Sequence, residues 1–172
     1  MTRRIRLAFV VVIGVVLQTT LFTHLRIDGV VPDVGLVAVL AVAYSDGAES
    51  GAWFGFVAGL SIDVFLTTPL GLSALSYAIT GYAVGVFQTG VVRTPHAIAP
   101  LLGGIGGFFG GITFLAIGAA VGQEGFLSVA GLKTVLVAAL YDGAIAPVVF
   151  PLVRAAARRS EHALTWRIGR VR

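Results

Sequence analysis

The sequence predicts an all-α membrane protein with six transmembrane helices, and two observations carry this prediction. Of its 172 residues 57% are hydrophobic and only 12% are charged, whereas a soluble domain carries about 25% charged residues. The apolar residues also gather in six runs, and a helix needs about 20 of them to span a hydrocarbon core of roughly 30 Å. Six spans fill nearly the whole chain and leave no room for a soluble domain.

Polar, glycine or proline residues separate the six predicted spans. The start of the chain, MTRRIRLAFVVVIGVVLQ, which contains most of the first span, resembles a signal peptide. No small-x-small cleavage site follows before Arg26, so we interpret this run as a retained span. The second and third runs are short, and steep or partly re-entrant helices are expected there. The spans cover residues 6–24, 31–45, 51–67, 70–89, 97–121 and 131–154.

The basic residues predict the orientation, because Lys and Arg beside the spans are retained in the cytoplasm. With six spans, ten of the twelve lie on the side of the two termini, and only Arg26 and Lys133 lie on the other. Both termini are therefore expected to be cytoplasmic. The chain then divides into one transmembrane domain, residues 1–156, and a basic tail, residues 157–172. That tail is either an interfacial helix on anionic lipid or disordered.

The net charge of +4 is compatible with several partners. Because the basic residues lie at the two ends of the chain, lipid headgroups are favoured over nucleic acid. The chain has no cysteine, its three histidines are scattered, and it contains no phosphate-binding loop or nucleophile elbow. The sequence therefore predicts a protein without enzymatic activity, metal or cofactor.

Glycine is unusually frequent inside the predicted spans. The chain has 23 glycines, against a usual frequency of about 7%. Lipid provides no hydrophobic force between helices, so small residues four apart serve to bring two backbones together. Gly51, Gly55 and Gly59 form such a stripe on the third span. The stretch GGIGGFFGG, residues 103–111, predicts a close or bent crossing on the fifth.

Two aspartates lie inside predicted spans. Asp63 follows Gly59 by four residues and so continues the glycine stripe toward packed helices. Asp142 lies near the middle of the last span, one turn before Pro147. No Lys or Arg falls inside any span, and a charge in hydrocarbon costs at least about 2.5 kcal/mol. Each acid is therefore protonated, hydrogen-bonded, hydrated or paired with a partner. Candidate donors in the spans are Gln18, Thr19, Ser73, Ser76, Tyr77, Thr80 and Thr113.

Two interpretations of these acids stay open. One is a polar clasp that fixes the register of the helices, and the other is a proton or ion site. The remaining acids, among them Asp33, Asp46 and Glu49, are expected to be solvated in loops. Tyr44 and Trp53 fit the aromatic belt at a membrane interface.

Several of these residues together resemble the MreD family of bacterial rod shape-determining proteins. They are Gln18 in the first span, Pro32-Asp33 at the start of the second, GAWFGFVAGLSID from Gly51 to Asp63, Gly71, Gly81-Tyr82, and YDGAIAP from Tyr141 to Pro147. The resemblance implies a multi-pass protein of the bacterial inner (plasma) membrane that belongs to the cell-elongation machinery. Its implied partners are MreC and, through it, MreB, RodA and a class B penicillin-binding protein. The family is also similar in fold to the S components of energy-coupling-factor transporters.

Three functions are compared. The first is a non-enzymatic scaffold that grips the transmembrane helix of MreC through the Gly51/Gly55/Gly59 face or the Asp63 region. The alternative is a substrate-binding component of a vitamin or small-molecule transporter. Such components commonly carry AxxxA on the first span, whereas here Ala8 is followed four residues later by Val12. The third is a proton-coupled carrier built on Asp63 and Asp142.

Overall fold

The computed structural model describes residues 29–87, 95–123 and 125–158, and within them the regular elements are five helices. The all-helical prediction is thus confirmed for this part of the chain. The predicted first span, Gln18 and residues 159–172 of the tail lie outside the described residues. The helices are α2 (Val34–Asp46), α3 (Ala48–Asp63), α4 (Leu72–Phe87), α5 (Pro95–Ala120) and α6 (Val129–Arg158).

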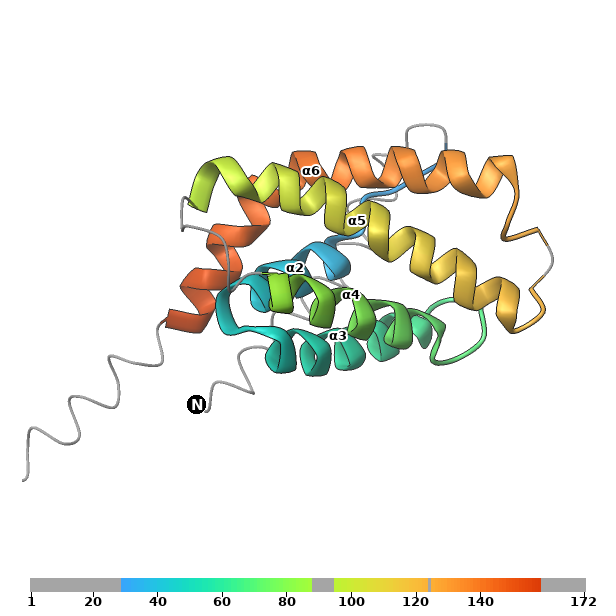
Figure 1. The fold of residues 1–172 in the computed structure, drawn as a ribbon, viewed down its shortest axis with the longest axis horizontal. Helices are drawn as coiled ribbons and strands as arrows, with labels where there is room; N and C mark the ends of the chain where they lie inside the picture. Colours follow the sequence, from blue (N-terminus) through green and yellow to red (C-terminus); the bar gives the residue numbers. More distant parts are fainter. Residues whose placement is uncertain (1–28, 88–94, 124, 159–172) are drawn as a thin grey trace, which may run out of the picture.

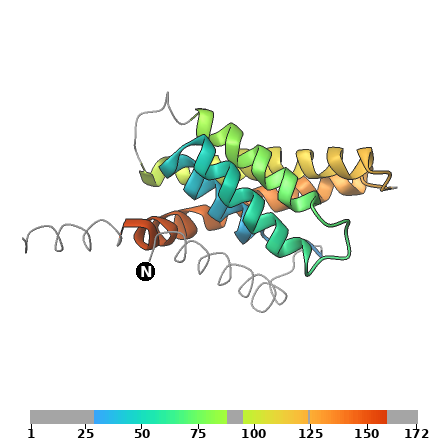
Figure 2. The same cartoon turned by 90° about the horizontal axis from the view of Figure 1, so that it is seen from below.

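Helix α2 is the centre of the described bundle (Figures 1 and 2). It contacts α3, α4, α5 and α6, which also contact one another in chain order, α3 with α4, α4 with α5 and α5 with α6. Its sequence, VGLVAVLAVAYSD, is apolar on every side up to Tyr44, and a helix of this kind is stable only when it is surrounded. All residues from Val34 to Tyr44 are accordingly buried.

The helices differ strongly in length. The apolar parts of α5 and α6, Ile98–Ala120 and Val129–Ala155, are long and apolar enough to cross a membrane. At 1.5 Å per residue α5 is about 39 Å long and α6 about 45 Å, whereas α2 is about 20 Å and α3 and α4 are each about 24 Å. The helices at the second and third predicted spans are short, as the sequence predicts. Helix α4 begins at Leu72, two residues after the start of the fourth predicted span.

The glycine stripe of α3 packs directly on the backbone of α4. A Cβ added to Gly51 would lie 2.6 Å from the carbonyl oxygen of Gly81, and one added to Gly55 would lie 2.4 Å from that of Tyr77. One added to Gly59 would lie 2.4 Å from the carbonyl oxygen of Ser73. No side chain fits at any of the three positions, so the glycines serve a close helix pair within the chain.

The glycine-rich stretch of α5 packs against two helices at once, which confirms the close crossing predicted there. A Cβ on Gly103 or Gly107 would meet α6 at Asp142, 2.6 Å away in each case. A Cβ on Gly106 or Gly110 would meet a leucine side chain of α2 at 2.7 Å. Two rows of glycine on neighbouring faces thus let α5 fit between α2 and α6.

Helix α6 bends in its last third (Figure 1). Pro147 and Pro151 lie inside the helix, and a proline removes one backbone hydrogen bond and pushes away the preceding turn. Beyond the bend, Arg154 of α6 contacts the C-terminal end of α2. The guanidinium carbon of Arg154 lies 5.3 Å from the ring centroid of Tyr44, and its Nε donates to Ser45 Oγ at 3.3 Å.

Candidate functional site: the buried aspartates

Asp63 lies at the end of α3 with its side chain only 1% exposed. Its Oδ2 accepts from the backbone N–H of Gly71 at 2.9 Å, and its Oδ1 accepts from that of Ser73 at 3.0 Å. Oδ2 also accepts from the N–H of Ala74 at 3.2 Å. Both carboxylate oxygens are therefore bonded to the chain's own backbone.

Two of these donors, Ser73 and Ala74, belong to the first turn of α4, which begins at Leu72, and Gly71 directly precedes it. The first N–H groups of a helix have no partner inside it, and the positive end of the helix dipole favours an acidic group there. Asp63 thus caps α4 from the preceding helix, across the loop of residues 64–71. The neighbouring Gly59 allows this contact, because its close approach to Ser73 and Ala74 brings the start of α4 to the acid.

Asp33 caps α2 and joins two other helices to it. Its Oδ1 accepts from the N–H of Leu36 at 3.0 Å, and its Oδ2 accepts a short hydrogen bond from the hydroxyl of Tyr77 on α4. Its own N–H donates to Oδ1 of Asp142 on α6 at 2.7 Å. Asp33 is half-buried and both its carboxylate oxygens are bonded within the chain, so its interpretation as a solvated loop residue is wrong. An aspartate directly before an apolar helix is a signal for an N-cap, and that signal is present in the sequence.

Asp142 is 1% exposed and lies against the glycine surface of α5. A Cβ on Gly107 would lie 2.6 Å from its Oδ2, so a larger residue at position 107 would displace the carboxylate. Asp142 bonds to Asp33 and does not bond to Asp63. The acids therefore form two structural junctions, one at the start of α4 and one where α2, α4 and α6 meet.

The hydroxyl groups of α4 do not bond to the acids inside the spans. Ser76 Oγ donates to the carbonyl oxygen of Gly110 on α5 at 2.8 Å, and Thr80 Oγ1 donates to that of Ser76 at 2.8 Å. The hydroxyl of Tyr77 bonds to a carboxylate, that of Asp33, whereas Ser73 reaches Asp63 through its backbone N–H. In the described ranges no group of three or more His, Cys, Asp or Glu is placed to hold a metal ion.

Two tyrosines differ in how their hydroxyls are bonded. Tyr77 donates to Asp33, whereas the buried hydroxyl of Tyr44 has no hydrogen-bond partner among the described residues. Tyr44 is 6% exposed, lies under Arg154 and has the ring of Phe150 at 6.5 Å. Its assignment to the exposed aromatic belt is wrong, while Trp53, 67% exposed, has the exposure that such a position requires.

Comparison with known protein families identifies the chain. Residues 2–155 match the family of the rod shape-determining protein MreD. The chain belongs to the MreD family. The match covers all five described helices up to Ala155. No curated protein matches the chain, and no solved structure matches it.

Membership of the MreD family makes this a membrane protein with a role in determining rod shape. The residues that carry the sequence resemblance now have positions in the fold. GAWFGFVAGLSID is the part of α3 whose glycines and Asp63 contact α4, and Asp33 of Pro32-Asp33 is the cap of α2. YDGAIAP is the part of α6 that meets Asp33 and the glycines of α5. Gln18 lies outside the described residues.

Proposed function

We propose that this MreD family protein is a non-enzymatic scaffold of the cell-elongation machinery. In this role it binds MreC and, through it, MreB, RodA and a class B penicillin-binding protein. It acts as a multi-pass protein of the inner membrane with six spans and both termini in the cytoplasm. Family membership supports the cellular role, and the bonding of Asp63 and Asp142 supports the scaffold over a proton-coupled carrier.

The acids are the observation that carries this choice. Both oxygens of Asp63 accept hydrogen bonds from backbone N–H groups at the start of α4, and Oδ1 of Asp142 accepts one from the backbone N–H of Asp33. Backbone donors hold their positions as long as the helix stays folded. A proton carrier instead needs an acid that exchanges its partner in each cycle. The acids are therefore interpreted as clasps that keep the helices in register.

The partner surface on α3 is proposed to be the face opposite its glycines. Gly51, Gly55 and Gly59 are covered by α4, so a helix of MreC has no access to them while the α3–α4 pair is intact. The opposite face is exposed and carries an aromatic residue at its cytoplasmic end. Its residues follow helical spacing, with Trp53 67%, Phe56 43%, Val57 47% and Leu60 41% exposed. Tryptophan is enriched among residues that dominate binding energy.

The experiment is purification of the tagged protein in mild detergent, with quantification of bound MreC. Replacing both Trp53 and Leu60 by alanine should lower bound MreC about tenfold or more, since each lost anchor costs over about 1 kcal/mol. The matched control replaces Leu136 and Leu140, exposed on α6, and should leave binding unchanged. Equal binding by both variants would contradict the assignment to α3.

The function itself is tested by depletion in the native cell. Loss of the protein should make rod-shaped cells round and displace MreC from its normal positions. Cells that stay rod-shaped, with MreC correctly placed, would reject the scaffold. A vitamin or other small molecule that copurifies in stoichiometric amount would favour the transporter component instead.

A further inference from the structure

We propose that the α3–α4 loop, residues 64–71, is inserted into the lipid bilayer at the level of the headgroups and upper acyl chains. Asp63 makes this insertion possible by bonding the backbone donors that water would otherwise satisfy. The partner of the loop is thus the lipid itself, on the membrane side opposite the α2–α3 turn.

Helix length gives the first argument. Helices α3 and α4 have 16 residues each, or about 24 Å, whereas the hydrocarbon core measures roughly 30 Å. Their hairpin is therefore too short to carry its loop across the core into water. The tip of the α5–α6 hairpin lies at the same end of the molecule and extends farther than the α3–α4 loop (Figures 1 and 2).

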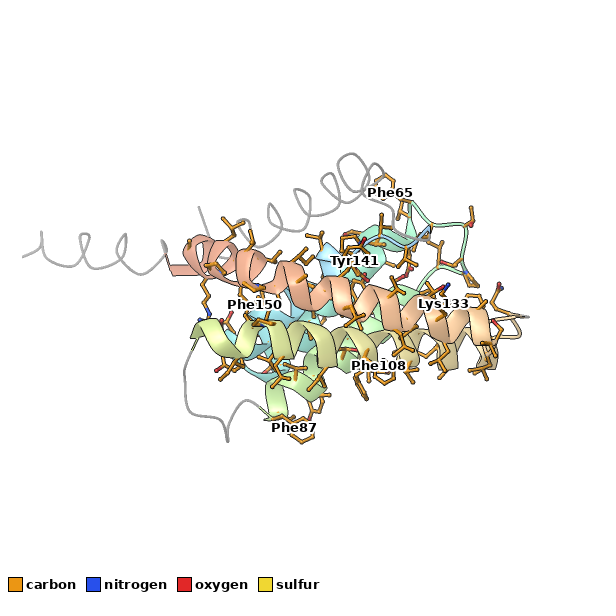
Figure 3. All side chains as sticks on the ribbon, turned by 90° about the horizontal axis from the view of Figure 1, so that it is seen from above. Phe65, Phe87, Phe108, Lys133, Tyr141 and Phe150 are labelled. Atoms are coloured by element: carbon orange, nitrogen blue, oxygen red, sulfur yellow. The ribbon has the colours of Figure 1, made fainter. Side chains whose placement is uncertain are left out.

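The composition and exposure of the loop give the second argument. No charged residue occurs between Asp63 and Arg93. The loop presents four large apolar side chains to the outside, and Figure 3 shows Phe65 at the rim of the bundle. In water such a cluster is unfavourable, at about 25 cal/mol per Å² of apolar surface. The exposed fractions are 69% for Val64, 68% for Phe65, 45% for Leu66 and 73% for Leu70.

The bonding of the loop backbone gives the third argument. Irregular backbone is tolerated at membrane depth only where its polar groups find partners in the protein. Asp63 binds the N–H of Gly71 and two N–H groups of the α4 start. Within the loop, the N–H groups of Phe65 and Leu66 bond to backbone carbonyls, and Pro69 has no N–H. The carbonyl of Pro69 accepts from the N–H of Leu72 at the start of α4. The exposed residue at the tip of the loop, Thr67, is then placed among the headgroups.

The test uses single cysteines, because the chain has none of its own. Leu70→Cys is compared with Leu127→Cys in the α5–α6 loop, a matched site with 76% exposure against 73%. The full-length protein is reconstituted in phosphatidylcholine–phosphatidylglycerol vesicles and treated with a membrane-impermeant maleimide. Both loops lie at the same end of the molecule, so mixed orientation in the vesicles affects both sites equally.

Leu70→Cys should react several-fold more slowly than Leu127→Cys in vesicles and equally fast after unfolding in detergent. A fluorophore at position 70 should be quenched by brominated lipid, and one at position 127 by iodide in the water. Equal reactivity in vesicles, together with iodide quenching at both positions, would overturn the insertion.

The role of Asp63 is tested in the same assay. Adding Asp63→Ala to Leu70→Cys removes all three bonds and should raise the maleimide reactivity toward that of Leu127→Cys. Asp63→Asn keeps one strong acceptor and should give an intermediate reactivity. This variant also provides the test if the alanine variant does not fold. Unchanged reactivity in the asparagine variant and in any folded alanine variant would show that Asp63 does not hold the loop.

Discussion

Asp142 accepts a hydrogen bond at 2.7 Å from the backbone N–H of Asp33, a residue 109 positions earlier in the chain. This bond joins the middle of α6 to the start of α2. Asp33 in turn holds Tyr77 of α4, so three helices meet at one pair of acids. The consequences of this junction, and of the close helix contacts around it, are open to measurement.

The Asp142 side chain should act chiefly as an acceptor. Asp142→Ala leaves the N–H of Asp33 without a partner, which should lower the free energy of unfolding by about 1–3 kcal/mol. Asp142→Asn keeps an acceptor at Oδ1 and should lose clearly less. Thermal unfolding in detergent compares the two. Equal losses would show that the negative charge, and not the hydrogen bond, is what the site requires.

The α3–α4 contact should not accommodate even one methyl group at the position of Gly55. In Gly55→Ala the new Cβ would lie 2.4 Å from the carbonyl oxygen of Tyr77, so the helices must separate, at a cost of about 1–3 kcal/mol. Gly104→Ala is the matched control, because its Cβ meets only the carbonyl oxygen of Ala139, at 3.7 Å. It should be neutral or stabilising by up to about 1 kcal/mol. Similar destabilisation by both variants would contradict the packing argument.

Removal of a tyrosine hydroxyl should have opposite effects at two buried positions. Tyr77→Phe loses the donor to Asp33 and should destabilise the protein by about 1–3 kcal/mol. Tyr44→Phe removes a buried hydroxyl that has no partner in the part of the chain that the structure describes, so stability should stay equal or rise. The midpoint of thermal unfolding measures both. A larger loss for Tyr44→Phe would mean that its hydroxyl is bonded in the membrane.

Arg154 should restrain the bent end of α6. Arg154→Ala removes the contacts with Tyr44 and Ser45, each weak at a partly exposed position, so the loss of stability should stay below about 1.5 kcal/mol. A spin label at Leu152, 64% exposed, should nevertheless become more mobile. Arg154→Lys keeps the cation above the ring and should give an intermediate spectrum. Identical spectra for all three proteins would show that the prolines alone set the bend.

Three features could be predicted from the sequence: the presence of the helices, the burial of Asp63 and Asp142, and the role of glycine in helix packing. They depend on composition and on helical spacing, which are local properties. The partners of the acids do not follow in the same way. The hydroxyls of Ser73, Ser76 and Thr80 are the donors that the sequence suggests. Ser73 instead reaches an acid through its backbone N–H, and the hydroxyls of Ser76 and Thr80 bond to backbone carbonyls. Which helix start meets which acid depends on the tertiary arrangement.

Asp33 shows a second limit of structure prediction from the sequence. Proline and aspartate beside a predicted loop are typical of solvated turns, and the same pair is also typical of a helix start. Only the position of α6, brought near by the glycines of α5, places Asp142 opposite this cap. Likewise, Gly51, Gly55 and Gly59 predict a close contact without identifying the second helix. The structure assigns it to α4.

Helices α3 and α4 meet through main-chain atoms at Gly51, Gly55 and Gly59. Ordering a long side chain at an interface costs up to about 2 kcal/mol of conformational entropy, whereas glycine has no rotamers to lose. Within the glycine rows, little entropy is therefore lost when the two helices associate, beyond that of the helices themselves. A pair of this kind is expected to form early during membrane insertion and to move afterwards as one rigid body.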